Sequence, residues 1–352
     1  METLDNILAQ ISPVDENARR EAADRQDRLT KPRGSLGRLE EIACRVCAIK
    51  KTNHPRVSRK RIVLFAADHG VTEEGVTLYP KEVTSQMVRN FVRKGAAINA
   101  IGESVGVEVE VVDIGVDDDL ADMEGFIRKK IARGTSNIAR GPAMSIEQAT
   151  EAVLVGVERA ETAWRDGIEL LGTGDMGIGN TTPSAALYAA MLDLPASEVT
   201  GRGTGLGDER LIHKVKIVEQ AIKVNKTRIT DTFSALAALG GFEIAGLCGL
   251  VIGAARRCIP VVIDGFISSA AAMMAIKMKP EVRQYCFFGH LSQEKGHAAL
   301  MERFGEKPLL DLDMRLGEGT GAALAMAIIE AAVAMHNNMA TFDSAGVSDK
   351  EG

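Results

Sequence analysis

Short apolar runs rich in β-branched residues recur along the chain, and each ends in a glycine or a carboxylate. Six such runs lie at residues 61–68, 107–113, 168–172, 260–264, 285–289 and 308–313. Ala-rich stretches with a helical period separate them, at 147–164, 183–191, 242–255 and 268–277. This alternation predicts an α/β fold, in which helices cover both faces of a mostly parallel sheet of about six strands.

Carboxylates mark the ends of the predicted strands. Asp68, Asp113, Asp175, Asp264 and Asp313 lie at or just past these ends. For any one of them, capping of the following helix is the favoured interpretation. As a set they locate the functional edge of the sheet, because ligands of such sheets bind beyond the carboxyl ends of the strands.

Two segments lie outside the alternating pattern. Residues 5–29 resemble an amphipathic helix, and residues 321–339 form an Ala-rich helix. We therefore expect an α/β domain at 30–320 and a small helical subdomain made of 1–29 and 321–352. The last residues, 342–352, are polar and are expected to be frayed.

The net charge of −6 over 352 residues argues against a general binder of nucleic acid, which needs clustered lysine and arginine. The N-terminus lacks a signal-peptide pattern, and no stretch of about 18 uninterrupted apolar residues predicts a membrane span. We expect a cytoplasmic protein. The five scattered cysteines suit reduced thiols, and Cys44 and Cys47 have redox spacing but lie in a predicted helix, where packing is the preferred role.

The strongest candidate for anion binding is the glycine-rich segment 172–182. Its Gly177, Gly179, Asn180 and Thr181 precede a predicted helix. Glycines let backbone N–H groups approach an anion, and the helix start adds partial positive charge, so the segment predicts a phosphate cradle. The alternative is a tight turn without a ligand.

Three further positions could contact the same phosphate. Gly203 and Gly205 belong to a run of alternate glycines, which suits either a loop lining a site or a flexible surface loop. Lys214 follows on a helix and could supply a positive charge, although a solvated lysine is the default. Ser292 resembles a helix cap that could also donate to a phosphate.

The histidines give weaker signals. His290 and His297 are seven residues apart without a third ligand at metal spacing, so the sequence predicts no metal site. His69 directly follows Asp68 and is a better functional candidate, with a structural hydrogen bond as an equally favoured alternative.

Glu318 lies in a Gly-Glu-Gly turn after the run at 308–313. A carboxylate flanked by glycines would face the cleft, and the apolar Leu316 beside it favours a raised pKa, as a general base near neutrality requires. The alternative is a carboxylate that interacts with the dipole of the following helix.

An apolar loop after the first strand carries Leu78 and Tyr79, and Gln86 lies in the helix that begins at Val83. This combination suits a flat heteroaromatic ligand, with Tyr79 stacked on the ring and Gln86 bonded to its edge. Core packing of these residues is the competing interpretation.

Six segments in this order resemble the nicotinate-nucleotide:dimethylbenzimidazole phosphoribosyltransferases of cobalamin assembly: 31–40, 68–71 with 75–87, 172–182, 261–268, 290–296 and 315–321. The resemblance covers essentially the whole chain. It implies a Rossmann-like sheet, a homodimer, and transfer of phosphoribose from nicotinate mononucleotide to 5,6-dimethylbenzimidazole with inversion at C1′. It implies neither a metal nor a redox cofactor.

The resemblance also assigns roles to residues. Glu318 matches the general base, and Leu316 matches an apolar wall of the base pocket. The regions that bind the two substrates contain Leu78, Tyr79, Gln86, Met176, Gly177, Gly179, Asn180, Thr181, Gly203, Gly205, Lys214, Ser292 and Arg315. Asp175 stands where we expect a glutamate in many relatives, so its carboxylate reaches one methylene less and its role as a second acid is less certain.

Two other function classes stay open on the sequence alone. The glycine segment at 172–177 satisfies the dinucleotide pattern of an NAD-dependent oxidoreductase, but the acid expected after the second strand of such a unit is missing. The other class is a non-catalytic nucleotide-binding protein.

Overall fold

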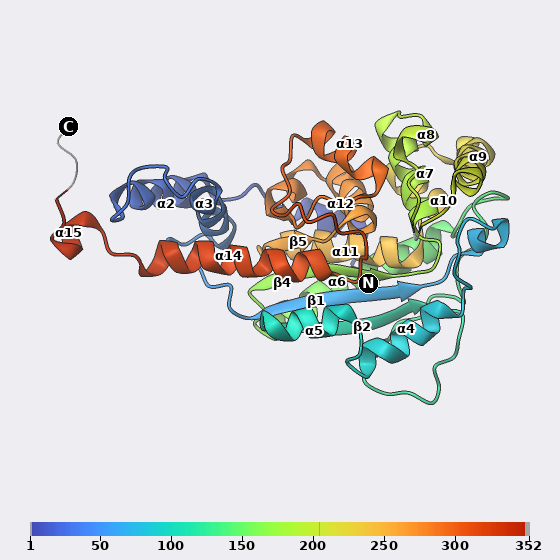
Figure 1. Cartoon of the computed structure of the whole chain (residues 1–352), viewed down its shortest axis with the longest axis horizontal. Coiled ribbons are helices and arrows are strands. Elements are labelled where there is room, and N and C mark those ends of the chain that lie inside the picture. The colour runs from blue at the N-terminus through green and yellow to red at the C-terminus, as the bar shows by residue number, and fades with distance from the viewer. Residues whose placement is uncertain (1, 204, 349–352) are drawn as a thin grey trace.

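The computed structural model describes residues 2–203 and 205–348 of the chain. Its centre is a parallel six-stranded sheet with the order β3-β2-β1-β4-β5-β6 (Figure 1). The strands are β1 (Lys60–Ala67), β2 (Val107–Gly115), β3 (Ile127–Arg128), β4 (Leu170–Met176), β5 (Val261–Ile263) and β6 (Cys286–Phe288). This is the strand order of a doubly wound Rossmann sheet, which confirms the predicted fold class.

Five of the six predicted runs are strands, and one is not. Residues 308–313 form no strand: Leu310 makes only an isolated bridge to His290, and Asp313 has a left-handed backbone with φ of 55°. The sixth strand is instead β3, whose two residues are too few to produce a hydrophobic pattern. A further difference is that β4 continues to Met176, so Asp175 lies within the strand rather than after it.

Helices surround the sheet on both faces. They are α1 (Leu4–Ala9), α2 (Glu16–Arg28), α3 (Arg38–Lys50), α4 (Val83–Val92), α5 (Ala97–Ser104), α6 (Ile146–Arg165), α7 (Thr181–Leu192), α8 (Ala196–Val199), α9 (Asp208–Asn225), α10 (Thr232–Leu239), α11 (Phe242–Arg256), α12 (Phe266–Met278), α13 (Lys295–Phe304), α14 (Thr320–Asn338) and α15 (Phe342–Ala345). The four helices predicted between the strands correspond to α6, α7, α11 and α12.

The two faces of the sheet are covered by different helices. Helix α11 lies against one face with α6 packed behind it, and α14 and α5 lie against the other. In β1, Phe65 contacts the α11 face and Ile62 the α14 face, as alternating side chains of a strand require. Helices α6 and α11 touch closely because of glycine: a Cβ on Gly156 would lie 1.9 Å from the carbonyl oxygen of Gly246.

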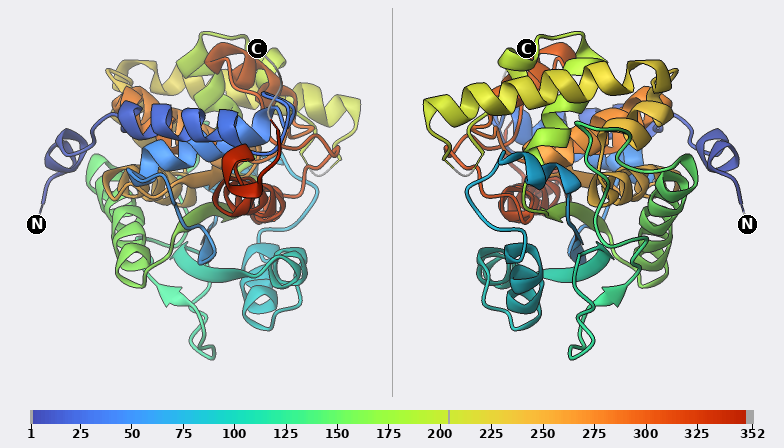
Figure 2. Two further views of the ribbon diagram at one scale, coloured as in Figure 1. Left: turned by 90° about the vertical axis from the view of Figure 1, so that its left-hand side faces the viewer. Right: turned by 90° about the vertical axis from the view of Figure 1, so that its right-hand side faces the viewer.

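The chain ends differ from the prediction in two ways. The segment predicted as one helix at 5–29 is two helices, α1 and α2, and Figure 2 shows α1 projecting at the side of the molecule. The segment expected to be frayed forms α15, which Thr341 caps by accepting from the N–H of Ser344. Residues 349–352 lie outside the described part of the chain.

Helices from both ends of the chain pack together at the edge farthest from the carboxyl ends of the strands (Figure 1). Arg25 of α2 donates to the carbonyl oxygen of His336 in α14, at 2.9 Å. Cys44 and Cys47 lie buried within α3, in contact with Ala22 of α2, and are unpaired thiols. Their role in helix packing is as predicted.

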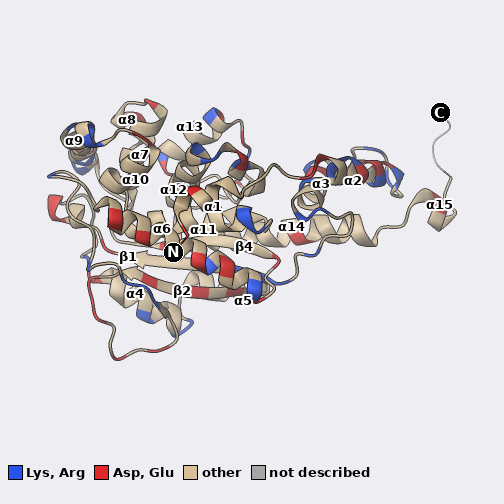
Figure 3. Ribbon diagram, turned by 180° about the vertical axis from the view of Figure 1, so that it is seen from behind, with Lys and Arg blue, Asp and Glu red and all other residues tan. Residues whose placement is uncertain are grey.

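The apolar helix α14 and the distribution of charged residues bear on possible contacts with membranes and polyanions. Within the described residues, one helix, α14, is long and apolar enough to cross a membrane by length and composition. That helix packs against β1, β4, α3 and α5. In Figure 3, where the ribbon is coloured by residue type, positions of Lys and Arg and positions of Asp and Glu are both spread along the chain.

Candidate active site

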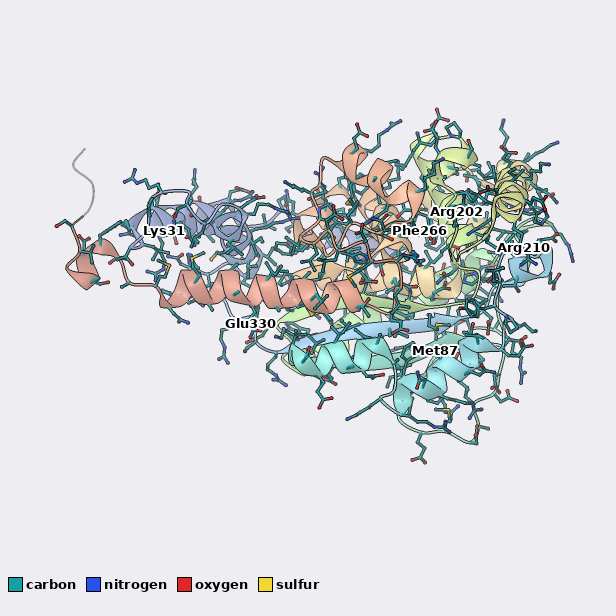
Figure 4. All side chains as sticks on the ribbon, viewed as in Figure 1. Lys31, Met87, Arg202, Arg210, Phe266 and Glu330 are labelled. Carbon is teal, nitrogen blue, oxygen red and sulfur yellow. The ribbon has the colours of Figure 1, made fainter. Side chains whose placement is uncertain are left out.

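A cavity of about 580 Å³ lies at the carboxyl ends of the strands. Its walls come from the ends of β4, β5 and β6 and from the segments before α4, α9 and α14. Figure 4 shows Met87, Arg202 and Phe266, which line it, toward one end of the molecule, and Lys31 toward the other.

Most of the residues predicted for the site line this one cavity. They are Tyr79, Asp175, Met176, Gly177, Gly179, Asn180, Thr181, Gly203, Lys214, Ser292, Arg315, Leu316 and Glu318. Segments more than 200 residues apart in sequence therefore meet at the sheet edge that the strand-end carboxylates marked.

Three predicted residues lie outside the lining: Leu78, Gln86 and Gly205. Leu78 is 47% exposed beside the cavity mouth. Gln86 is exposed on α4, because the helix turns Val83 and Met87, four residues apart, toward the cavity instead. An apolar pair thus occupies the wall where the sequence suggested an amide.

Glu318 sits in a turn of three successive left-handed residues. The φ angles of Gly317, Glu318 and Gly319 are 86°, 63° and 93°. Glycine adopts this conformation freely, but Glu318 does so at a cost of about 1–2 kcal/mol. Such strain at a cavity wall is typical of a functional position.

Glycine also lets this turn sit directly on the sheet. A Cβ on Gly319 would lie 2.9 Å from Ile62 Cγ2 and 3.0 Å from the carbonyl oxygen of Thr173. A Cβ on Gly174 would lie 2.7 Å from the carbonyl oxygen of Glu318. The position of Glu318 therefore depends on small residues on both sides of the contact.

The Glu318 carboxylate is buried and held from another helix. Glu318 is only 6% exposed. Its Oε2 accepts a hydrogen bond from the N–H of Ile98 in α5, at 3.2 Å. Burial raises its pKa, more than the hydrogen bond from Ile98 lowers it, and the nearby carboxyl of Asp264 raises it further. The hydrogen bond of this side chain therefore comes from the N-terminus of α5 rather than from the following helix α14.

Asp175 lies beside this turn, at the end of β4. Its Oδ2 accepts from Asn180 Nδ2 at 3.1 Å. The pKa of Asp175 is raised well above its usual value, first by burial and then by the charges of Asp264 and Glu243. Burial and the neighbouring carboxylates therefore both favour the neutral form of Asp175.

The strand-end aspartates do not cap the helices that follow them, so that prediction is wrong. Asp264 Oδ1 instead accepts from the N–H of Ala322, 2.9 Å away, in the first turn of α14. The other strand-end groups accept from Asp117 N–H (Asp68), Val116 N–H (Asp113), Asn180 Nδ2 (Asp175) and Gln293 Nε2 (Asp313). They stabilise loops and, through Asp264, the helix that follows Glu318.

The end of the cavity where the sequence predicts anion binding is formed by the loop after β4 and by α9. The loop from Gly177 to Asn180 leads into the N-terminus of α7, where Thr181 begins the helix. Lys214 Nζ donates to Thr181 Oγ1 at 2.7 Å. Lys214 is only 1% exposed, which contradicts the solvated-face interpretation, and burial lowers its pKa to about 8.

Ser292 is not the helix cap that its spacing predicted. Helix α13 begins at Lys295 with Glu294 as N-cap, and Ser292 Oγ accepts from the N–H of Glu294 at 3.3 Å. Its own N–H donates to His297 Nδ1 at 2.9 Å. Ser292 is thus a buried residue on the cavity wall, held by Glu294 and by His297 of α13.

His69 forms a buried pair with Glu243, with 2.6 Å between Nε2 and Oε1. Although burial opposes the charged form, the Glu243 carboxylate raises the pKa of His69. A Cβ on Gly177 would be 3.1 Å from His69 Nε2, so the pair lies against the loop that follows β4. His69 does not line the cavity, in agreement with its structural interpretation.

Several lining residues were not predicted for the site: Val76, Thr77, Val83, Met87, Ile178, Arg202, Asp264, Gly265, Phe266, Ile267, His290, Glu294 and Gly317. Asp264 had been marked only as a strand-end carboxylate. Phe266 and Ile267 begin an apolar helix, so their pattern is the same as that of core residues. Among the residues the structure describes, no group of three or more His, Cys, Asp or Glu is placed to hold a metal ion.

Comparison with known proteins shows the family to which this chain belongs. Residues 11–347 match a family model described as phosphoribosyltransferase. Nicotinate-nucleotide–dimethylbenzimidazole phosphoribosyltransferase of Chlorobaculum tepidum is 54% identical over 344 residues, which cover 98% of each chain. The protein of the same name from Geobacter sulfurreducens is 52% identical over 349 residues, 99% of each chain.

Solved structures agree with the sequence relatives. The crystal structure of CobT from Thermus thermophilus has a TM-score of 0.91 and 45% identity, and covers 95% of this chain and all of that chain. A second structure from the same organism, of the phosphoribosyltransferase named above, has a TM-score of 0.90 and 44% identity, and covers 96% of this chain and all of that chain. The names of the sequence relatives and of the second structure specify phosphoribosyl transfer, which the oxidoreductase alternative does not fit.

Proposed function

Since the chain belongs to the nicotinate-nucleotide–dimethylbenzimidazole phosphoribosyltransferase family and is a phosphoribosyltransferase, we propose that its substrates are nicotinate mononucleotide and 5,6-dimethylbenzimidazole or a related base. The products are α-ribazole 5′-phosphate and nicotinate, formed with inversion at C1′.

The observation that carries this proposal is the position of the Glu318 carboxylate. It lies in a cavity that is also lined by Tyr79, Val83 and Met87, with Leu316 beside the turn. Tyr79 and Leu316 are 50% and 59% exposed, and both belong to the lining of this one cavity. A flat ring between these surfaces would cover them and bring a ring nitrogen to Glu318.

Glu318 acts as the general base. The pyridinium of nicotinate mononucleotide is a cationic leaving group that departs as neutral-ring nicotinate. One nitrogen of the benzimidazole attacks C1′ from the opposite face, and its other nitrogen sheds a proton to Glu318. The raised pKa of Glu318 suits this task, and a base of this kind contributes on the order of 10²–10⁴-fold in rate.

Asp175 assists by staying neutral. Two carboxylates in one buried site cannot both ionise without a large penalty, and burial together with the neighbouring carboxylates raises the pKa of Asp175. A protonated Asp175 leaves Glu318 as the proton acceptor and adds a hydrogen-bond donor to the cavity wall.

The nucleotide phosphate binds at the other end of the cavity. The backbone N–H groups of the Gly177–Thr181 segment, the N-terminus of α7 and the Lys214 ammonium supply the positive potential. Ser292 and Arg315 on the cavity wall add donors. Fixing the phosphate positions C1′ for attack.

We also propose that the enzyme is a cytoplasmic homodimer. All five cysteines are free thiols, which suits a reducing compartment. Light scattering during size-exclusion chromatography measures the assembly: a mass of about twice the 37.6 kDa of the chain supports the dimer, and a mass equal to it contradicts the dimer.

The test of the function is a product assay. Purified enzyme is incubated with nicotinate mononucleotide and a panel of benzimidazoles and adenine, and the product is identified by mass and by the anomeric configuration at C1′. Release of nicotinate with an α-riboside phosphate supports the proposal. A β-riboside, or hydrolysis to ribose 5-phosphate without transfer, contradicts it.

A further inference from the structure

A buried carboxylate lies at the end of the cavity proposed to bind the phosphate. Glu294 is 6% exposed and lines the cavity together with Lys214 and Ser292. Its Oε2 is buried and has no hydrogen-bond partner among the residues that the structure describes. A negative charge beside an anion site opposes anion binding, so the position of this carboxylate needs a physical reason.

Glu294 and Lys214 both contact the same glycine. The carbonyl oxygen of Gly201 accepts from Lys214 Nζ at 3.4 Å, and a Cβ on Gly201 would be 1.9 Å from Glu294 Oε2. Farther along the same loop, a Cβ on Gly203 would be 3.4 Å from Lys214 Nζ. A side chain at position 201 would push the carboxylate away. Glycine in this loop therefore keeps the carboxylate close to the ammonium.

Further contacts hold both side chains in place. Lys214 Nζ donates to Thr181 Oγ1, at the start of α7, over 2.7 Å. Glu294 is the N-cap residue of α13, and its N–H donates to Ser292 Oγ at 3.3 Å. Both residues are more than nine-tenths buried, so solvent ions screen the interaction between their charges much less than at the surface.

Each of the two charges favours the ionised form of the other. Burial lowers the pKa of Lys214, and the Glu294 carboxylate raises it in return. Burial raises the pKa of Glu294, and the Lys214 ammonium is the first group that lowers it. Without the Glu294 carboxylate, the buried lysine would lose its proton at a lower pH.

The other charged groups around Lys214 do not replace this carboxylate. Arg202 and Arg315 line the cavity, but they are exposed cations. Helices α7, α8 and α10 pack against α9, and they carry the buried Tyr188, whose pKa burial raises well above its usual value, and the exposed Glu198. The basic turn at 226–228 packs at the far end of α9. The nearest charged or titratable residues on α9 itself are exposed: Arg210, His213 and Lys216.

Resting on the phosphate site proposed above, we propose that Glu294 is a positioning residue that keeps Lys214 protonated in the cavity, so that the nucleotide phosphate meets a cation at neutral pH. Glu294 acts through Lys214 rather than on the substrate, since its Oε2 packs against Gly201. The carboxylate thereby allows a lysine to be buried at the phosphate site and still carry its charge.

A carboxylate that only repelled the phosphate would give the opposite pH dependence. Its replacement by a neutral group would strengthen nucleotide binding, and this gain would stay constant or grow with pH as the carboxylate ionises. A carboxylate that keeps Lys214 charged makes the neutral variant lose affinity as pH rises, because the lysine then loses its proton earlier. The sign of the change with pH therefore separates the two roles.

The experiment uses two matched pairs of proteins. The first pair is the wild-type protein and Glu294→Gln, which differ in charge but hardly in size. The second pair is Glu294→Asp and Glu294→Asn, which share one shape and both suit an N-cap position. Calorimetry between pH 6 and pH 9 measures the binding of nicotinate mononucleotide without an acceptor base. Glu302→Gln, at an exposed position on α13, is the control, and thermal unfolding checks the fold of each variant.

In each pair, we expect the neutral member to lose affinity at a pH lower by about one unit. Since the pKa of Lys214 is about 8 in the wild-type protein, the Kd of Glu294→Gln relative to wild type should rise about fivefold between pH 6 and pH 8. Ionisation of the nucleotide phosphate, with a pKa near 6, is common to all the proteins and cancels from this ratio. Glu302→Gln should follow the wild-type protein.

Three results would overturn the inference. The first is an equal midpoint in the wild-type protein and a folded Glu294→Gln, or a Kd ratio that falls as pH rises. The second applies if Glu294→Gln does not fold: equal midpoints in Glu294→Asp and Glu294→Asn would then show that the charge has no effect on Lys214. The third is loss of the fold in both neutral variants, which would make Glu294 a residue of folding.

These outcomes are separate from those that test the function. If the wild-type protein forms no α-riboside, the proposed reaction fails. If it forms the α-riboside and Lys214→Ala weakens nucleotide binding, but the charge at position 294 leaves the midpoint unchanged, the reaction and the phosphate site stand and the inference about Glu294 fails.

Discussion

The carboxylate of Glu318 accepts a hydrogen bond from the backbone N–H of Ile98, 3.2 Å away and 220 residues earlier in the chain. Ile98 lies in the first turn of α5, whose N-cap residue is Ala96 and offers no side-chain acceptor. Glu318 therefore satisfies a helix N-terminus that the helix itself leaves open. The contact fixes the carboxylate while burial keeps its pKa raised.

The first prediction is an acidic limb in the pH profile. The kcat/KM for the base should rise with pH as Glu318 loses its proton in the free enzyme, because only the ionised form accepts a proton. Since the pKa of Glu318 is raised, the midpoint should lie above the usual glutamate value of about 4.3. Steady-state rates between pH 4 and pH 8 measure it; a midpoint at or below the usual value contradicts the role.

Lys214→Ala should weaken nucleotide binding. Loss of a charged contact to the phosphate is worth about 1.5–3 kcal/mol, so the KM for nicotinate mononucleotide should rise by about 10- to 100-fold. Lys216→Ala, an exposed lysine on the same helix, is the control and should leave KM unchanged. An equal KM in both variants would return Lys214 to a structural role.

The same lysine predicts an alkaline limb. Its pKa is lowered to about 8 by burial, so the free enzyme should lose the ammonium charge as pH rises through 8. In the wild-type protein, kcat/KM for nicotinate mononucleotide should fall with a midpoint near this value. In Lys214→Ala that limb should disappear, and its persistence would show that another group titrates there.

Asp175→Asn should change how stability depends on pH. Because the folded pKa of Asp175 is raised, the folded state holds its proton more tightly than the unfolded state does. Stability from this group is fully present below the unfolded value, about 3.9, and is lost as pH rises toward the folded pKa. The loss is at most about 1.4 kcal/mol per pH unit.

Urea unfolding between pH 4 and pH 8 measures this effect. The variant should gain stability relative to the wild-type protein as pH rises, because asparagine carries no charge at any of these pH values. Asp193→Asn, at an exposed position after α7, serves as the control and should follow the wild-type protein. A constant difference between Asp175→Asn and the wild-type protein would mean that Asp175 is ionised in the folded state.

Gly319→Ala should move the turn at Gly317, Glu318 and Gly319. Alanine would carry a Cβ at a φ of 93°, and that atom would lie 2.9 Å from Ile62 Cγ2. We expect destabilisation by about 1–3 kcal/mol and a fall in kcat, because the strained turn must shift from the end of β4. Gly141→Ala meets nothing within 4 Å and is the control. Full activity in Gly319→Ala would show that the turn tolerates displacement.

The sequence predicted the parts of the fold whose patterns are long. Strand β1 and helix α6 show continuous or periodic apolar positions over many residues, so their existence and type were readable. Strand β3 has two residues and is defined by its pairing with β2, which no local pattern encodes. In the run at 308–313, Leu309 and Leu310 pack against the core, but the only strand-like pairing in the run is the single bridge between Leu310 and His290.

The candidate site was predictable where glycine or a strand end gave a local signal, as at Glu318 and Gly177. It was not predictable where the decisive fact is a long-range contact. The apolar start of α12 looks like core, yet Phe266 lines the cavity. Gln86 and Met87 are adjacent in sequence, and only the rotation of α4 decides which one faces the cavity.

The central claim is that Glu318 takes the proton from the attacking base. Glu318→Gln tests it most directly, because glutamine keeps an acceptor for the N–H of Ile98 and removes only the ability to take a proton. Glu103→Gln, at an exposed position on α5, is the control. Transfer from nicotinate mononucleotide to 5,6-dimethylbenzimidazole is measured beside calorimetric binding of the nucleotide. We predict that kcat falls by about 10²–10⁴-fold in Glu318→Gln while the nucleotide Kd stays within about twofold. A kcat equal to that of the wild-type protein would contradict the account.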